Sequence, residues 1–313
     1  MSFIPKLGTV VRVALVVVSI GATSLKAQTQ VENSSNTNVG TAASTDTTKA
    51  LDSKKAAVTT TVETMLVTAS IATAKSTSSP ETAVPQTVAA DKWQFQVSPY
   101  FWLAGLHGTG GVGNRTTNVD ESFRDVFHAL NFALMGTFEA RKKRFISLTD
   151  LEYVSVSDEK ATPGPLFSTV DAGFKTFIFD QEVGYRILEN PDKGASLDVL
   201  GGARVWHVST DFEFGAGILP ATRIKGSRNW VDAVGGLRGK MALSQKLFLT
   251  GKFDLGGGGS KFTWQVFAGG GYNINPKVAL IFGYRVLDVD YDKNNFVYDM
   301  NQRGPIVGLE FRF

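Results

Sequence analysis

Two side chains that could act together in catalysis stand two positions apart, at His207 and Ser209. A serine hydroxyl becomes a nucleophile when a histidine takes its proton and a carboxylate orients that histidine. If this segment is a strand, its alternation puts His207 and Ser209 on the face opposite Arg204. The nearest acids, Asp211 and Glu213, lie farther along the same segment, and none is placed convincingly on a neighbouring one. The pair is therefore a candidate catalytic site without a clear acid.

The tripeptide His207-Val208-Ser209 resembles the His-x-Ser pair of outer-membrane lipid A deacylases. That resemblance implies a lipid A-modifying enzyme whose two residues face the bilayer, where such an enzyme meets its substrate. The alternative interpretation is a histidine at the membrane interface, beside Trp206 in a belt of aromatic residues. We favour the interfacial histidine, and hence a protein that is not an enzyme.

No arrangement in the sequence predicts a metal or cofactor site. The histidines at 107, 128 and 207 are far apart and cysteine is absent, which removes the usual zinc ligands. The run Gly256 to Gly259 lacks the spacing of a phosphate-binding loop. Another segment has the alternating ligands of a calcium loop, but Lys293 stands where such a loop needs glycine. Its residues are Asp288, Asp290, Asp292, Asn294 and Asp299. We expect an acidic outer loop there, bridged by divalent cations to lipopolysaccharide.

Charged residues at alternate positions of the predicted strands are the largest set with a shared chemistry. The acids are Glu139, Asp150, Glu152, Glu182, Asp198, Asp232, Asp254 and Glu310. The bases are Arg141, Arg186, Arg204, Arg238, Lys240, Lys252, Arg285 and Arg312. Because an unpaired buried charge is costly, we expect these acids and bases to pair inside a barrel. A barrel of about eight to ten strands is filled by such side chains, whereas open pores need roughly 16 strands. The sequence predicts a closed, charge-balanced lumen; the alternative is a narrow ion path along the pairs.

The elements that must carry these residues are strands, and the clearest is the last stretch, Pro305 to Phe313. Its odd positions are apolar, and its even positions include Glu310 and Arg312. Lipid can cover the apolar face of a closed barrel while the lumen takes the charges. The stretch resembles the terminal strand of bacterial outer-membrane barrels, which implies that Leu309, Phe311 and Phe313 are read by the barrel-assembly machinery.

From Trp93 onward the same alternation recurs in aromatic-rich segments, which predicts about ten antiparallel strands in residues 91–313. Eight strands are the alternative. Short connections are expected near Lys142, Asn190, Gln245 and Pro276. Longer ones are expected near Pro163, Pro220, Gly257 and Asn294, on the opposite side of the membrane. The first long connection contains Ser122, which could cap a helical turn that folds over the barrel mouth.

The residues before the barrel predict export and a disordered arm. Residues 1–27 have the basic start, apolar run and small residues of a signal peptide. Residues 28–90 are rich in Thr, Ala and Ser and have no aromatic residue, so they cannot bury enough apolar area to fold. One piece resembles the box by which TonB-dependent receptors engage their energising partner through strand addition. Its residues are Glu63, Thr64, Val67, Thr68 and Ala69. The chain lacks the plug domain and the length of those receptors, so a chance match is the alternative.

Composition sets the class of protein. The 313 residues are 43% hydrophobic with a net charge of +3, which is too mild to predict nucleic-acid binding. No run of about 18 apolar residues follows the signal, so membrane residence would require strands. As a whole, the region from Trp93 to Phe313 resembles small bacterial outer-membrane barrel proteins. We expect a structural or surface-interaction role in the outer membrane with the arm in the periplasm; the alternatives are a narrow channel, a TonB-coupled uptake accessory and the lipid A-modifying enzyme.

Overall fold

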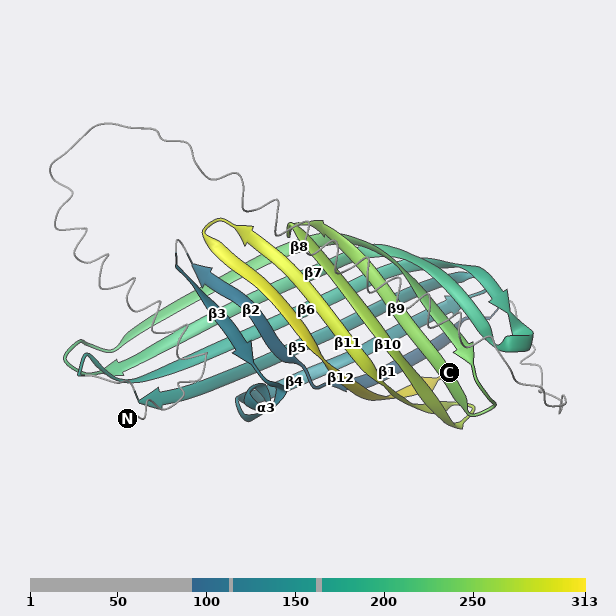
Figure 1. The fold of residues 1–313 in the computed structure, drawn as a ribbon, viewed down its shortest axis with the longest axis horizontal. Coiled ribbons are helices and arrows are strands. Elements are labelled where there is room, and N and C mark those ends of the chain that lie inside the picture. Colours follow the sequence, from purple (N-terminus) through teal and green to yellow (C-terminus); the bar gives the residue numbers. More distant parts are fainter. Residues whose placement is uncertain (1–91, 113–114, 162–164) are drawn as a thin grey trace, which may run out of the picture. The chain divides into compact units, whose positions relative to one another are not determined.

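Twelve strands form one antiparallel sheet, and ten of them close into a ring (Figure 1). The computed structural model describes residues 92–112, 115–161 and 165–313. The ring runs from β1 through β4 to β12 in sequence order, and the pairing of β12 with β1 closes it. Its strands are β1 (Gln94–Trp102), β4 (Leu130–Lys142), β5 (Phe145–Ala161), β6 (Phe167–Asn190), β7 (Ala195–Ala216), β8 (Thr222–Ala242), β9 (Leu247–Gly258), β10 (Phe262–Asn275), β11 (Val278–Lys293) and β12 (Phe296–Arg312). The prediction of a closed antiparallel barrel of about ten strands is confirmed, and the eight-strand alternative is wrong.

A hairpin and a short helix complete one end of the ring, which we call the α3 end. Strand β2 (Gly105–Val112) continues the line of β1 along β12, and β3 (Arg115–Glu121) folds back onto β2. Helix α3 (Phe123–His128) then leads into β4. Ser122 caps this helix as predicted. This hairpin was not predicted, because its glycines and polar residues do not show the apolar alternation of a barrel strand.

The connections at the opposite end, the C-terminal end, are short as predicted, and one of them is the 3-10 turn η1 (Pro191–Lys193). At the α3 end, the prediction of long connections near Gly257 and Asn294 is wrong, because both connections are short turns. Strands β11 and β12 are joined by a two-residue turn in which Asn294 and Asn295 have φ angles of 53° and 57°. Asparagine tolerates this conformation better than most residues do. The acidic segment predicted as a loop therefore belongs to the ends of β11 and β12.

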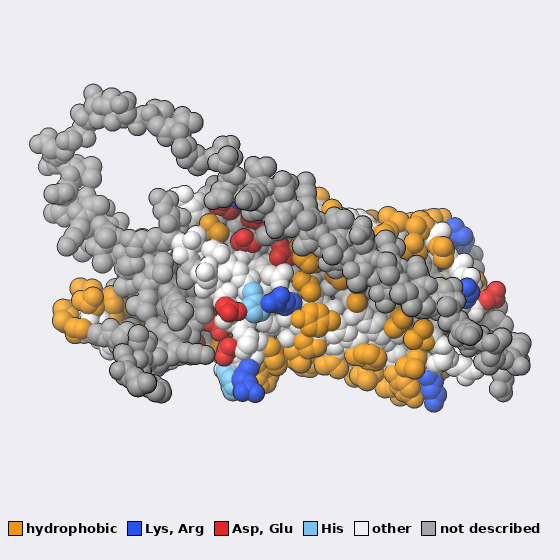
Figure 2. Space-filling view, viewed as in Figure 1, with side chains coloured by type: hydrophobic (Ala, Val, Ile, Leu, Met, Phe, Trp, Pro, Cys, Tyr) orange, Lys and Arg blue, Asp and Glu red, His pale blue; other side chains and the backbone are white. Residues whose placement is uncertain are grey.

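Alternation along each ring strand separates an apolar outside from a mixed inside. Apolar side chains that point outward and are exposed form what we call the apolar belt. It includes Phe138, Val199, Leu237, Leu249, Phe282 and Val307. The belt ends abruptly toward the α3 end, where the outward series of β7 passes from Val205 to His207. The space-filling view shows apolar side chains over one part of the barrel and acidic, basic and histidine side chains beyond them (Figure 2).

The longest strands reach past the belt. A membrane strand needs about 9–11 residues, whereas β6 has 24 residues and β7 has 22. At the α3 end they extend beyond shorter strands such as β9, and β8 extends with β7 as far as the pair Phe214–Thr222 (Figure 1). No helix in the described residues has the length and apolar character to cross a membrane. The predicted signal peptide (1–27), arm (28–90) and TonB-box-like residues Glu63, Thr64, Val67, Thr68 and Ala69 lie outside the described residues.

Candidate functional site

The interior of the barrel near the C-terminal end is crossed by ion pairs. Arg238 on β8 donates to Glu139 on β4 over 2.6 Å and to Asp198 on β7 over 2.9 Å. Arg186 on β6 donates to the second oxygen of Asp198 over 2.9 Å. Because β4 and β8 are four positions apart in the ring, the Arg238–Glu139 pair joins opposite walls. Arg141 also donates to Glu139, over 3.0 Å.

A second network fills the middle of the barrel around Arg204. This side chain has no exposed surface and binds both oxygens of Asp180, over 2.8 and 2.9 Å. It also donates to Asp254 over 2.8 Å. Lys252 pairs with Glu182 and lies 3.3 Å from Asp254. Every base in this group therefore has a carboxylate partner, as the cost of a buried charge requires.

Arg285 on β11 extends this network to the opposite wall. Its guanidinium lies 3.1 Å from Asp150 and 2.5 Å from Glu152, both on β5. It also donates to the Tyr100 hydroxyl over 3.0 Å, and that hydroxyl donates to Asp150 over 2.8 Å. Strands β5 and β11 lie four positions apart in the ring, so this cluster is another tie across the lumen.

Two of the predicted interior groups have different surroundings. Asp232 is buried and accepts hydrogen bonds from the backbone and hydroxyl of Ser260, over 2.6 and 2.8 Å, so it acts as a cap for the β9–β10 connection. Glu310 accepts from Arg312 over 2.6 Å and lies 3.6 Å from Lys240, at the C-terminal end where both bases are partly exposed.

Asp180 was not predicted as an interior residue. It is 1% exposed, and both of its carboxylate oxygens accept hydrogen bonds from Arg204. The signal was present, because Asp180 has the same parity as Glu182 and Arg186 on one strand. With Asp180 the inward carboxylates number one more than the predicted bases. Gln265 was missed as well; it joins Asp254 to Arg285 with hydrogen bonds of 2.6 and 2.9 Å.

Above the ion pairs, toward the α3 end, the interior becomes aromatic. Trp230 stacks on Tyr291 with ring centroids 4.2 Å apart and on Trp206 at 5.4 Å. Tyr298 meets the edge of Trp206 at 6.3 Å. These side chains belong to a buried apolar cluster, in which Trp206 is fully buried. The interpretation of Trp206 as part of an outer aromatic belt is therefore wrong, because its even position points inward with Arg204.

The candidate catalytic pair is not assembled. His207 and Ser209 point outward just beyond the apolar belt, and the Nδ1 atom of His207 is hydrogen-bonded to the amide oxygen of Asn229. An amide thus occupies the place where a triad needs a carboxylate. Asp211 is engaged elsewhere, accepting from Arg223 over 2.8 Å. The pair lies at the level where the outer surface changes from apolar to polar.

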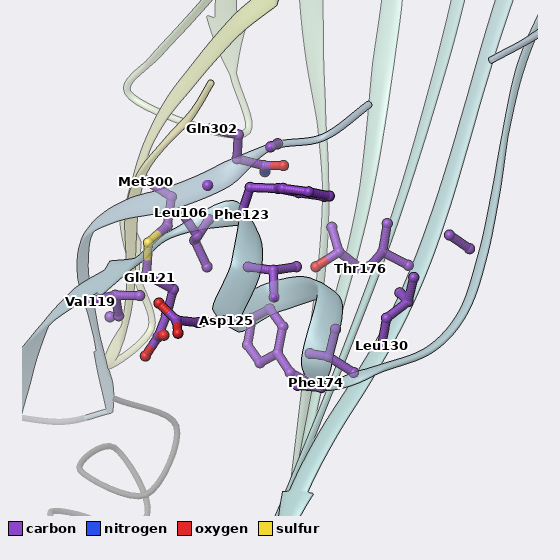
Figure 3. Close-up of a pocket in the computed structure, with 18 of the residues that line it drawn as sticks. Leu106, Val119, Glu121, Phe123, Asp125, Leu130, Phe174, Thr176, Met300 and Gln302 are labelled. Carbon is purple, nitrogen blue, oxygen red and sulfur yellow. The ribbon is translucent and has the colours of Figure 1, made fainter. Parts of the chain in front are cut away.

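An apolar pocket opens at the α3 end, and we call it the α3 pocket. It has a volume of about 270 Å³ and lies beneath α3, between the inner faces of β4, β5, β6 and β12 and the β2–β3 hairpin. Figure 3 shows α3 between Leu106, Val119 and Met300 on one side and Leu130 and Thr176 on the other. The pocket could not be predicted, because it depends on the hairpin that the sequence did not reveal.

Helix α3 is held by its own cap. The Ser122 hydroxyl donates to the Asp125 carboxylate over 2.6 Å, and the Ser122 backbone N–H donates to it over 3.2 Å. Both bonds favour the ionised form and keep the pKa of Asp125 below its ordinary value. At the other end of the helix, the Ala129 carbonyl accepts from the backbone of Ser157 on β5 over 2.8 Å.

The terminal residues complete the ring. Leu309 and Phe311 point outward from β12, and Phe311 lies opposite Val97 on β1. The Phe313 backbone exchanges hydrogen bonds with Phe95, of 2.9 and 3.3 Å, and its ring is exposed. The end of the chain is thus part of the seam between the first and last strands.

No protein-family model and no curated protein matches the chain. Among solved structures it is similar to the outer membrane protease OmpT from Escherichia coli, with 11% identity, a TM-score of 0.45, and coverage of 75% of this chain and 99% of that one. Ail, the attachment invasion locus protein of Yersinia pestis, has 12% identity, a TM-score of 0.32, and coverage of 71% and 99%. The translocator domain of autotransporter NalP from Neisseria meningitidis has 12% identity, a TM-score of 0.38, and coverage of 84% and 98%. These neighbours are bacterial outer-membrane barrels, and the likeness concerns the fold alone.

Proposed function

We propose that the protein is an integral barrel of the bacterial outer membrane with a closed lumen, and that it acts as a structural or surface-interacting component of the envelope. The observation that carries this proposal is the pair of ties across the lumen, Arg238 with Glu139 and Arg285 with Asp150 and Glu152. These ties occupy the space that a pore would need. The aromatic layer of Trp206 and Trp230 lies above them.

The outer surface supports the same role. The apolar belt suits the hydrocarbon of a bilayer, and each ring strand pairs with a neighbour on both sides in a closed sheet, as a membrane requires. Beyond the belt the outward side chains of β7 and β8 are charged, with Arg223 and Lys225 beside Asp211. This polar extension is the surface on which we expect contacts with lipopolysaccharide or with molecules outside the cell.

The alternatives are not favoured by the geometry. A narrow channel would need a path through the paired side chains, and a lipid A-modifying enzyme would need an acid on His207 where Asn229 lies. We propose that Leu309, Phe311 and Phe313 are the part of the chain read by the assembly machinery, since they lie on the last strand of the ring. An interaction of Glu63 to Ala69 with a TonB-like protein stays a prediction.

Conductance in planar bilayers tests the closed lumen. We expect the wild-type protein to be nearly silent. The double variant Glu139→Ala/Arg238→Ala removes one tie across the lumen and should conduct more; Asp198 keeps its bond from Arg186, and Arg141, which loses Glu139, is partly exposed. The matched control is Asp211→Ala/Arg223→Ala, which removes an ion pair from the outer wall and should stay silent. Stable open-channel currents from the wild-type protein would overturn the proposal.

A further inference from the structure

The wall of the barrel is incomplete beside α3. The order of strands in the sheet ends at β3, and among the described residues no ladder joins β3 to β4 or β5. Strand β4 begins only at Leu130, opposite Val156, so the last residues of β5 pair with β6 alone. Helix α3 lies in this place instead of a strand (Figure 3). The α3 pocket is therefore bounded on this side by α3 and not by a paired strand.

This side of the pocket meets the apolar belt. Phe101 and Phe127 line the pocket and are 66% and 58% exposed, and Leu103 lines it between them along the chain. Phe132, at the start of β4, is 54% exposed on the outer surface nearby. Phe101 lies opposite Val307 of the belt, so it faces hydrocarbon in the membrane placement proposed above. An apolar molecule could pass from the bilayer into the pocket without crossing water.

The pocket is built for a hydrocarbon. Its walls are apolar side chains from β4, β5, β6 and β12, among them Met135, Val154, Ile178 and Met300. Methionine adapts its shape to an apolar ligand better than branched residues do. A dry apolar cavity of about 150 Å³ holds one benzene molecule, so a volume of about 270 Å³ suits a chain of medium length. Below it, Glu152 paired with Arg285 closes the way to the other end.

The edge of the pocket selects against anions. Glu121 and Asp125 line it, and none of the described lining residues is basic. A carboxylate or phosphate placed there would meet two acids. Thr176, Thr210 and Gln302 also line the pocket and offer hydroxyl and amide groups to an uncharged head. The charge and the shape thus point to the same class of ligand.

We propose that the α3 pocket binds an uncharged amphiphile with a single medium-length hydrocarbon tail, taken laterally from the bilayer. This inference rests on the proposed membrane placement but not on the closed lumen. Binding at this site needs no conduction, because the ion pairs below the pocket stay in place.

Methionine methyl groups report on the site directly. Met135 and Met300 line the pocket, whereas Met241 lies on β8 away from it. We would label the methionine methyl groups of the full-length protein with carbon-13 in micelles and titrate with 1-decanol. We expect saturable shifts of Met135 and Met300 while Met241 stays in place. Decanoate at neutral pH should bind more weakly because of the two acids.

Two variants make the test specific. Val154→Phe fills the pocket and should weaken decanol binding by about tenfold or more, since even one methylene matters this much in an apolar pocket. Val199→Phe makes the same change in the apolar belt and should leave binding unchanged. Absence of saturable shifts in the folded wild-type protein, or a smaller effect of Val154→Phe, would overturn the site. Equal binding of decanoate would overturn the uncharged head. Conductance measured on the same sample separates these failures from failure of the closed lumen.

Discussion

At the scale of single residues, Arg204 shows how a buried ion pair affects the free energy of unfolding. It is fully buried and neutralises Asp180 and Asp254 together. Arg204→Leu leaves two carboxylates without their main partner, so the free energy of unfolding should fall by about 3–5 kcal/mol. Urea unfolding in lipid vesicles measures this change. Arg223→Leu breaks an exposed pair with Asp211 and should cost far less, because solvent screens that pair. Similar losses in the two variants would contradict the role of Arg204.

Single residues also show the limits of parity as a guide. Alternation predicts that Arg204, Asp254 and Glu152 point inward, and these side chains are buried; the same alternation applies to Asp180. Alternation did not predict that the interior toward the α3 end is aromatic. Trp206 follows Arg204 by two positions and so has its parity, but an outward tryptophan is the usual arrangement near a membrane interface. Charge marks the inside of a barrel more clearly than aromatic character does.

At the scale of elements, α3 depends on the bond between Ser122 and Asp125. Because the folded pKa of Asp125 is lowered, the cap is complete above the ordinary carboxylate pKa and is lost as the pH falls through the lowered value. Titration of the Asp125 carboxyl carbon by NMR should give a pKa below the ordinary value near 3.9. Ser122→Ala should raise this pKa toward the ordinary value and loosen the helix. An unchanged pKa in that variant would contradict the capping box.

The same scale explains which elements the sequence could reveal. The ten ring strands alternate, because each has one face toward the apolar surroundings and one toward the interior. Strands β2 and β3 do not alternate in this way. Strand β2 pairs with β12 and carries glycines where the two backbones approach closely. At Gly108 the φ angle is 151°, and an added Cβ would lie 2.0 Å from the Asp299 carbonyl oxygen. That strand is defined by its contact with β12, and a single sequence does not show such a contact.

At the scale of the whole molecule, the proposed function depends on whether lipid hydrocarbon surrounds the apolar belt. Phe282 lies outward on β11 between Leu280 and Tyr284, within the belt. If hydrocarbon covers this surface, Phe282→Arg should lower the free energy of unfolding in vesicles by about 2–4 kcal/mol. Ile218→Arg makes the same kind of change at a side chain that is 72% exposed in the β7–β8 connection, beyond the belt, and should cost close to nothing. The two substitutions differ in the medium around the side chain, so equal costs would show that a bilayer does not surround this barrel.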